Sequence, residues 1–529
     1  MTLSNGDAWR SKPHRFWFTA CAICLSLYLS YVLFLAQSPV FTGALATALS
    51  LAWFMLFAAL LFAGMLLACR RLAKRAPKPA PVRQKLELAT LLPALAIPLV
   101  IFACGLLRCY PGGMSTDANT QWLQVQSGQF SNWHPVFHTL LMWLGTRLHN
   151  SYPLLVAEQL ALLSLALAYL VGTLRSWGAK RWVLLLIEGI LVASPLVGNT
   201  AMHMWKDNAM TIGALLLLAQ TTNAYLSRGE WLEKPRNVVA LGLTLAFTTL
   251  VRHNAFLLTV PLLLTLMLCY RSRWKRTLIA AAVMIGCAAF VLGPVYSWVG
   301  VTYPDNTFEE SVGVPLTILG DVRVKNPDAL TDEARAYLDR MATDEEWRTI
   351  YQPGNYNSIK FVDWEHRRLR VIDVDKADYF RMVADTVKAD PRDALLAVNE
   401  VTDLVWGVTE NEANVSSVSA SQVGDYRYLG TRVNELGKSL MRVFDVPMGV
   451  QPIRWYVGNI GVSFALMLLV AVYALYRNGV RALTLCVPPL LYNLGTMCML
   501  CGNDARFFQY SLLWCTFALV PLLRSPDAK

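Results

Sequence analysis

The amino-acid sequence predicts an all-α polytopic membrane protein with about twelve transmembrane helices and a mostly helical extracytoplasmic domain inserted before the last three helices. Of the 529 residues, 55% are hydrophobic and 16% are charged, and the mean hydropathy is +0.39. Soluble globular proteins are only about 45–50% apolar. The apolar residues also gather in runs of about 20, the length that crosses a bilayer. These observations exclude an ordinary soluble protein.

The net charge of +11 does not indicate nucleic-acid binding. The lysines and arginines form short clusters between apolar runs, a pattern that orients helices in a bilayer. We therefore expect membrane lipids, and no nucleic acid, among the partners. The eleven cysteines lie mostly inside apolar runs, so no disulfide framework is predicted. Cys498 and Cys501 form a C-x-x-C pair without a second ligand pair nearby, and packing is their expected role.

Residues 1–87 hold two expected helices and a basic linker. The first apolar run, 16–36, follows three basic residues, and the nearest A-x-A match already belongs to the next run. This pattern predicts a retained signal-anchor. The stretch 70–85 is basic and broken by prolines, which is typical of a cytoplasmic topology anchor near anionic lipid.

Twelve apolar runs are expected spans, because a crossing needs about 20 apolar residues, about 17 at the least, or fewer where a bundle helix is buried. They lie near 16–36, 44–69, 88–107, 153–174, 182–198, 209–226, 237–251, 255–270, 277–299, 456–476, 482–500 and 508–523. With the N-terminus inside the cell, the N-terminal tail and the loops that fall in the cytoplasm hold most of the Lys and Arg outside residues 301–455. Both termini are then cytoplasmic. Residues 88–300 form the expected membrane core, and 456–529 form the C-terminal spans.

One apolar piece, 136–148, does not fit as a crossing. It has 13 residues, it carries Arg147, and a crossing here would place the later basic clusters outside. We expect a juxtamembrane or re-entrant helix, and a short true span is the alternative.

Residues 301–455 have the composition of a soluble domain, which the topology places outside the cell. Helix-like apolar spacing covers 331–351 and 376–406, with an interruption in the second segment at Asp390-Pro391. The stretch 311–319 is apolar and rich in β-branched residues, so it predicts a strand or a buried turn.

The first large outer loop, 108–150, is where we expect chemistry. It places an isolated acid, Asp117, between two apolar segments, together with histidines, aromatic rings and turn-forming residues. The same topology brings three more polar clusters to this side of the membrane: NTAMHMWKDN, VRHNA and GNDARFF. Ionisable groups at membrane depth usually face a cavity or a partner, so the pattern predicts a shared aqueous cavity at the outer leaflet.

Asp117 and His134 have alternative interpretations. Asp117 lies in STDANTQW, which looks like a helix start, so it is either an N-cap or a base, and the two roles are compatible. His134, in Trp-His-Pro, is either functional or an interfacial anchor like the neighbouring Trp133.

The cations also have alternative interpretations. Lys206 and Asp207 can form a plain local ion pair of little energetic value. Arg252 and Arg506 suit phosphate binding because guanidinium offers a planar bidentate fork. The alternative for both is snorkelling to the lipid headgroups.

The motif YPGGMSTDANTQW, together with SNWHPVFHTLL, is similar to an uncharacterised group of bacterial membrane proteins assigned to the GT-C superfamily of membrane glycosyltransferases. The superfamily includes the protein O-mannosyltransferases and the enzymes that add aminoarabinose to lipid A. The resemblance runs over roughly residues 88–523. It implies transfer of a sugar from a polyprenyl-phosphate carrier to an acceptor hydroxyl on a lipid, glycan or protein, at the outer face of the bacterial cytoplasmic membrane.

Carried over to this sequence, the resemblance makes Asp117 the general base, and we place His134 beside it as a second catalytic residue. The remaining expected substrate- or phosphate-binding residues are Lys206, Arg252, Arg506, His203, His253 and Trp133. Many relatives have a second acid that in some binds a metal, whereas Ala118 and Asn119 follow Asp117 here. We therefore expect no cofactor and no metal. Two helices precede the usual first one, and the resemblance gives them no role.

The residue types suit this chemistry. A base must deprotonate the incoming hydroxyl, and fixed positive charge must stabilise the departing phosphate. A carboxylate also favours oxocarbenium character at the anomeric carbon. No Gly-rich nucleotide loop is present to suggest a soluble sugar-nucleotide donor. For the stereochemistry, we predict a single displacement with inversion at the anomeric carbon. The alternatives are a lipid or solute transporter and a membrane acyltransferase or ligase that uses His134 or His203 as base.

Overall fold

The computed structural model describes residues 12–36, 43–73, 83–304, 308–360, 374–409, 434–500 and 504–524. Within these ranges the chain forms helices and no strand, apart from two isolated backbone bridges. The predicted all-α class is confirmed. Residues 74–82 of the basic linker and Cys501 of the C-x-x-C pair lie outside the described residues.

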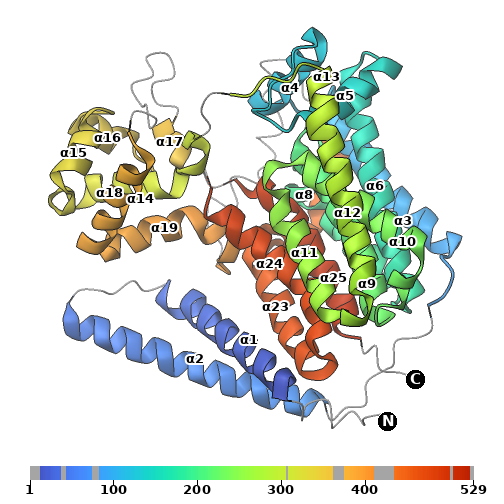
Figure 1. Ribbon diagram of the computed structural model, residues 1–529, viewed down its shortest axis with the longest axis horizontal. Coiled ribbons are helices and arrows are strands. Elements are labelled where there is room, and N and C mark those ends of the chain that lie inside the picture. Colours follow the sequence, from blue (N-terminus) through green and yellow to red (C-terminus); the bar gives the residue numbers. More distant parts are fainter. Residues whose placement is uncertain are drawn as a thin grey trace.

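Most of the helices belong to a bundle that Figure 1 shows on the right. Their bounds are α3 (Leu88–Arg108), α4 (Thr116–Ser127), α5 (Val136–Leu148), α6 (Tyr152–Ser176), α7 (Arg181–Ala193), α8 (Pro195–Ala201), α9 (Lys206–Leu226), α10 (Pro235–Val251), α11 (Phe256–Cys269), α12 (Trp274–Phe290), α13 (Tyr296–Trp298), α23 (Ile460–Asn478), α24 (Leu483–Met497) and α25 (Gln509–Leu522).

In the described part of the chain, seven helices are long and apolar enough to cross a membrane: Arg15–Leu35, Ala44–Ala73, Leu88–Arg108, Tyr152–Ser176, Lys206–Leu226, Arg271–Trp298 and Ile460–Asn478. The pair α7 and α8, bent by 65°, makes an eighth if it is one span. The bend falls at Ser194, whose side chain caps α8, and Pro195 occupies the first turn of α8. The prediction of a polytopic membrane protein therefore agrees with the length and apolar character of these helices.

Helix α9 lies at the centre of the bundle, where it packs against α6, α10 and α25. Its 18-residue apolar window is 94% buried, against 33% for α3 and 11% for the α12 span. In a membrane the outer helices expose their apolar faces to lipid, whereas a central helix has protein on all sides. The first residue of α9, Lys206, is therefore fixed by the best-packed element of the bundle.

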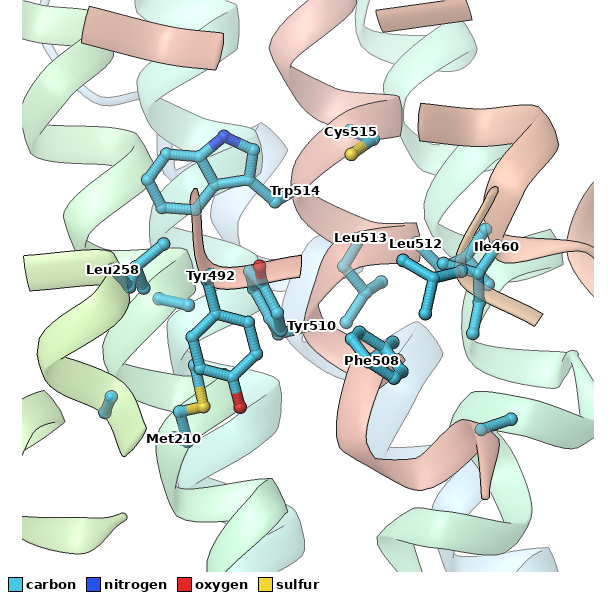
Figure 2. Close-up of a cluster of buried hydrophobic side chains, with 14 of the residues drawn as sticks. Met210, Leu258, Ile460, Tyr492, Phe508, Tyr510, Leu512, Leu513, Trp514 and Cys515 are labelled. Atoms are coloured by element: carbon cyan, nitrogen blue, oxygen red, sulfur yellow. The ribbon is translucent and has the colours of Figure 1, made fainter. Parts of the chain in front are cut away.

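Helix α25 brings a second set of buried side chains to the same core (Figure 2). Tyr492 of α24 and Tyr510 of α25 pack edge to face with ring centroids 4.8 Å apart. The Trp514 indole donates to the Leu485 carbonyl at 2.9 Å. Phe508 and Met210 are also buried here. Phe508 comes two residues after Arg506, and Met210 comes four residues after Lys206. This packing holds in place the backbone segments that carry Arg506 and Lys206.

The two N-terminal helices, α1 (Lys12–Ser30) and α2 (Ala44–Ala73), form a hairpin. A short π-helix continues α1 to Leu35. Helix α1 packs against α23, with Phe18 and Leu25 in one cluster with Ala465 and Val472. Only 6% of the apolar window of α2 is buried. An apolar helix with so little protein contact suits a lipid surrounding.

A lobe of helices lies beside the bundle (Figure 1, yellow to orange). It consists of α14 (Gly313–Lys325), α15 (Asp332–Asp339), α16 (Asp344–Ile350), α17 (Tyr356–Lys360), α18 (Lys376–Ala389) and α19 (Pro391–Trp406). The predicted interruption at Asp390-Pro391 is confirmed, because the Asp390 side chain accepts from the Asp393 amide at 3.0 Å and caps α19. Two further helices, α21 (Glu435–Asp445) and α22 (Gln451–Gly458), lead to α23, and α21 packs on α3.

The prediction of a strand or buried turn at 311–319 is wrong. These residues enter α14, which the other helices of the lobe surround. Val314, Leu316 and Leu319 are all buried in the core of the lobe. A short apolar run that is buried on every side has no amphipathic period to distinguish helix from strand, so tertiary packing decided the outcome.

Helix α5 has the bounds that the sequence predicted, Val136–Leu148. Its 13 residues rise about 20 Å at 1.5 Å per residue, which is less than the hydrocarbon thickness of about 30 Å. It packs against α4, on the loop side of the bundle. The interfacial helix and the short true span both stay predictions, because α11 and α25 are only one residue longer.

Candidate functional site

The polar clusters that the sequence placed in separate loops meet at one point of the structure. One carboxylate oxygen of Asp117 lies 3.3 Å from the Lys206 ammonium and 3.1 Å from the Arg506 guanidinium. Asp117 belongs to α4, Lys206 begins α9, and Arg506 lies in the short 3-10 helix Ala505–Phe508 before α25. Three segments that are distant in the chain therefore build one charged cluster.

The cap of α4 is Ser115, so the interpretation of Asp117 as the N-cap is wrong. The Ser115 hydroxyl accepts from the Ala118 amide at 3.3 Å. Asp117 lies two residues further on, in the first turn of α4, where a carboxylate interacts favourably with the helix dipole. Its side chain is 26% exposed and points to the cations rather than to the amides of its own helix. The acid is therefore available to a ligand.

Lys206 contacts the first outer loop twice. Besides Asp117, its ammonium lies 3.2 Å from Nδ1 of His134, which can accept a hydrogen bond when the imidazole is neutral. The predicted local pair between Lys206 and Asp207 does not form, because Asp207 pairs with Arg252. Neighbouring residues at a helix start point in different directions, and here they face different partners.

The pair of Asp207 and Arg252 is buried, with side chains 2% and 7% exposed. Arg252 also donates through Nε to the Asn254 amide oxygen at 2.7 Å, and Asn254 donates to Thr496 at 2.8 Å. This network joins α9, the junction of α10 with α11, and α24. The geometry gives Arg252 a structural partner within the protein, and its predicted contact with phosphate stays a prediction.

Arg506 is held on three sides. Asp504 contacts its Nε at 2.7 Å, Asp117 contacts a terminal nitrogen, and the Trp205 ring lies 4.6 Å from the guanidinium carbon. Trp205 in turn donates its indole N–H to the Ser115 hydroxyl at 2.6 Å. Trp205 and Ser115 thus connect the segments that carry Arg506 and Asp117. Neither residue was among the predicted site residues.

His203 packs against Trp205, the ring that contacts Arg506. Its ring stacks on Trp205 with centroids 4.0 Å apart and planes 8° apart, and the residue is only 3% exposed. The ring also lies close to Gly113, where a Cβ atom would lie 2.4 Å from His203 Nε2. The structure therefore places His203 inside a stack, and a direct contact with substrate remains a prediction.

Replacement of Gly113 by Ala is expected to lower the melting temperature and to disturb the stack of His203 on Trp205. The added methyl group has no room at 2.4 Å from the His203 ring, and overpacking of this kind costs about 1–3 kcal/mol. The matched control is Gly286→Ala in α12, where nothing lies within 4 Å of the built Cβ. Thermal unfolding in detergent gives the melting temperatures of both variants. Equal changes in melting temperature for the two variants would contradict the close packing of Gly113 on His203.

His253 and Trp133 lie at the rim of the cluster. His253 is exposed, and its ring contacts the backbone of Asn132 and Trp133. The Asn132 amide donates to the Thr302 carbonyl at 2.8 Å, which ties this loop to the chain after α13. The Trp133 side chain is 39% exposed. Both residues can therefore meet a molecule that approaches Asp117 from outside.

Burial and neighbouring charges together set the protonation states of Asp117 and His134. Burial alone would raise the pKa of Asp117, but Arg506 and Lys206 outweigh it and hold the pKa well below its ordinary value. Burial, reinforced by Lys206, lowers the pKa of His134 to about 3. At neutral pH the cluster thus contains a carboxylate, a neutral imidazole and two paired cations.

Acidification from pH 7 to pH 5 is expected to lower the melting temperature. Unfolded His134 takes up a proton below its ordinary pKa of about 6.5, whereas the folded residue stays neutral down to about 3. The unfolded state then binds more protons, so stability falls as the pH drops through this range. His134→Gln should lose less stability than the parent between these two pH values. An identical pH response of both proteins would contradict a buried neutral His134.

Within the described ranges, no three His, Cys, Asp or Glu side chains form a group that could hold a metal ion. Each cation of this region is paired with a carboxylate, both the two of the cluster, Lys206 and Arg506, and the neighbouring Arg252. The arrangement is suited to holding an anion that can exchange with one of these carboxylates.

A family model described as "Family of unknown function (DUF6020)" matches residues 122–524. No curated protein and no solved structure matches the chain. The matched region starts after Asp117 and includes His134, Lys206, Arg252 and Arg506. Because this region covers well over half of the 529 residues, the chain belongs to the DUF6020 family.

Proposed function

We propose that the protein is a glycosyltransferase that moves a sugar from a polyprenyl-phosphate carrier to an acceptor hydroxyl. The observation that carries the proposal is the contact of Asp117 with both Lys206 and Arg506. A partly exposed carboxylate beside two cations supplies a proton acceptor and a phosphate-binding group within one small region. The GT-C resemblance of the first outer loop supports the same reaction.

The proposal places the reaction at the outer face of a bacterial cytoplasmic membrane. In this topology α7 with α8, α10, α11, α24 and α25 join the seven longer spans to give twelve crossings. Both termini lie in the cytoplasm, and residues 301–455 lie outside. The cluster around Asp117 then opens to the outer leaflet, where lipid-linked sugars are accessible. The acceptor is a lipid, a glycan or a protein.

The transfer is a single displacement. The acceptor oxygen attacks the anomeric carbon, the bond from that carbon to the phosphate oxygen breaks, and the bonding electrons leave on the phosphate. The acceptor proton passes to the Asp117 carboxylate. Lys206 and Arg506 stabilise the negative charge that develops on the phosphate. The sugar lies between these groups, within reach of His134, His253 and Trp133.

The test is an assay of the purified protein with a panel of polyprenyl-phosphate sugars, in which released polyprenyl phosphate is measured. We expect release with at least one donor when an acceptor is present. Absence of release with every donor would overturn the proposed reaction and leave the fold and the charged cluster as described.

The product should have the inverted anomeric configuration. A one-step attack from the face opposite the phosphate inverts the anomeric carbon, whereas a covalent enzyme intermediate retains its configuration. NMR of the product, compared with the donor, distinguishes the two. Retention would rule out the single displacement assigned to Asp117.

A further inference from the structure

Asp117 forms ion pairs with the two cations that the proposed reaction needs for binding the phosphate. Lys206 and Arg506 both approach the same oxygen of the carboxylate, Oδ2, at 3.3 and 3.1 Å. A carboxylate held by two cations is a poor base, because the positive charges stabilise its ionised form. The cations are in turn partly neutralised. Neither the base nor the phosphate-binding group is therefore fully available in this arrangement.

The cations have other contacts that can keep them in place without Asp117. Asp504 and the Trp205 ring hold Arg506 from two further sides. Lys206 begins α9, and its ammonium also contacts His134. Asp117 can turn away without opening α4, because Ser115 caps that helix. The site can therefore lose this one carboxylate and keep its shape.

Charge favours an exchange of one anion for another. Lys206 and Arg506 carry two positive charges, and Asp504 neutralises one of them. The remaining positive charge is balanced by Asp117 in the described structure. A phosphodiester, which carries one negative charge, matches the same position. Two anions placed there together would repel each other.

We propose that the donor phosphate displaces the Asp117 carboxylate from Lys206 and Arg506, so that donor binding itself releases Asp117 to act as base. This inference rests on the proposed function and adds an order to it, with donor before acceptor. Before the donor binds, the base is held in its ionised and weakly basic form. After the exchange, the carboxylate has lost its cations and accepts the acceptor proton more readily.

The exchange is tested by measuring the binding of farnesyl phosphate to the purified protein in detergent by isothermal titration calorimetry. Farnesyl phosphate is a monoester like the released carrier, and it carries at least the one negative charge of the donor. If Asp117 competes with phosphate, Asp117→Asn should bind farnesyl phosphate about tenfold more tightly than the parent, because the competing charge is gone. Asp117→Ala should shift the affinity in the same direction. Farnesol, which lacks the phosphate, should show no such gain.

Two controls separate competition from a general loss of negative charge. Asp378→Asn removes an acid from α18 in the lobe and should leave the affinity unchanged. In an Arg506→Met background, the gain in affinity from Asp117→Asn should shrink, because Asp117 and the phosphate then no longer compete for Arg506.

The outcomes distinguish the two proposals. Equal or weaker binding of farnesyl phosphate by Asp117→Asn and Asp117→Ala, compared with a parent that binds it, would overturn the exchange alone. Failure of the parent and both variants to bind farnesyl phosphate would overturn the phosphate site and with it the proposed function. If Asp117→Asn tightens binding just as much in the Arg506→Met background, Asp117 and the phosphate do not compete for Arg506, and the exchange is overturned.

Discussion

Asp117→Asn is expected to lower the rate of polyprenyl phosphate release by about 10²- to 10⁴-fold, the usual contribution of a general base. Asparagine keeps the shape of the side chain but does not accept the proton of the acceptor hydroxyl. The substitution also removes the ion pairs with Lys206 and Arg506. Single-turnover assays with saturating donor measure the chemical step, so tighter binding of the donor phosphate does not compensate for the lost base.

The control for this variant is Asp378→Asn, which removes a carboxylate that pairs with Arg381 in the lobe. It should keep the parent rate. Melting temperatures of both variants separate a lost base from a lost fold. A fully active Asp117→Asn protein would contradict the assignment of Asp117 as the base and favour His134 or His203 as the group that deprotonates the acceptor.

Arg252→Met is expected to destabilise the protein by about 3–5 kcal/mol, because it leaves the buried Asp207 carboxylate without its cation. Unfolding in detergent, followed by circular dichroism, measures the loss. The double variant Arg252→Met with Asp207→Asn should recover most of it, since no buried charge then remains unpaired. A double variant no more stable than Arg252→Met would contradict the pairing.

Most of the helical framework could be predicted from the sequence. Long apolar runs carry their own signal, because the bilayer demands a minimum length, and each predicted span coincides with helix in the described residues. Short segments were harder to predict. Val136–Leu148 was found because a charge and its length set it apart, whereas 311–319 was missed because an all-apolar run has no period to identify it.

The candidate site was predictable in composition and less so in pairing. The topology indicated that Asp117, His134, Lys206 and Arg506 share one side, and the structure brings these four together. Which acid faces which cation depends on the rotation of each helix, and the sequence does not give that rotation. For this reason the partner of Asp207 was not foreseen.

The supporting stack was missed for a related reason. Trp205, Ser115 and Gly113 have common roles at membrane surfaces and helix starts, as belt, cap and turn residues. One signal was available in the sequence, since STD is a capping pattern in which Ser can serve as the cap and leave the acid free. The contact of Trp205 with Arg506 needed the three-dimensional structure.

The central claim is that a lipid-linked phosphate binds where Asp117, Lys206 and Arg506 meet. The most direct test is photolabelling of the purified protein with farnesyl phosphate that carries a diazirine next to the phosphate, followed by mass spectrometry. We predict that the label which excess farnesyl phosphate displaces lies within residues 113–134, 203–210 and 504–510. Displaceable label confined to the basic loops 228–236 and 271–276, or no displaceable label at all, would contradict the claim.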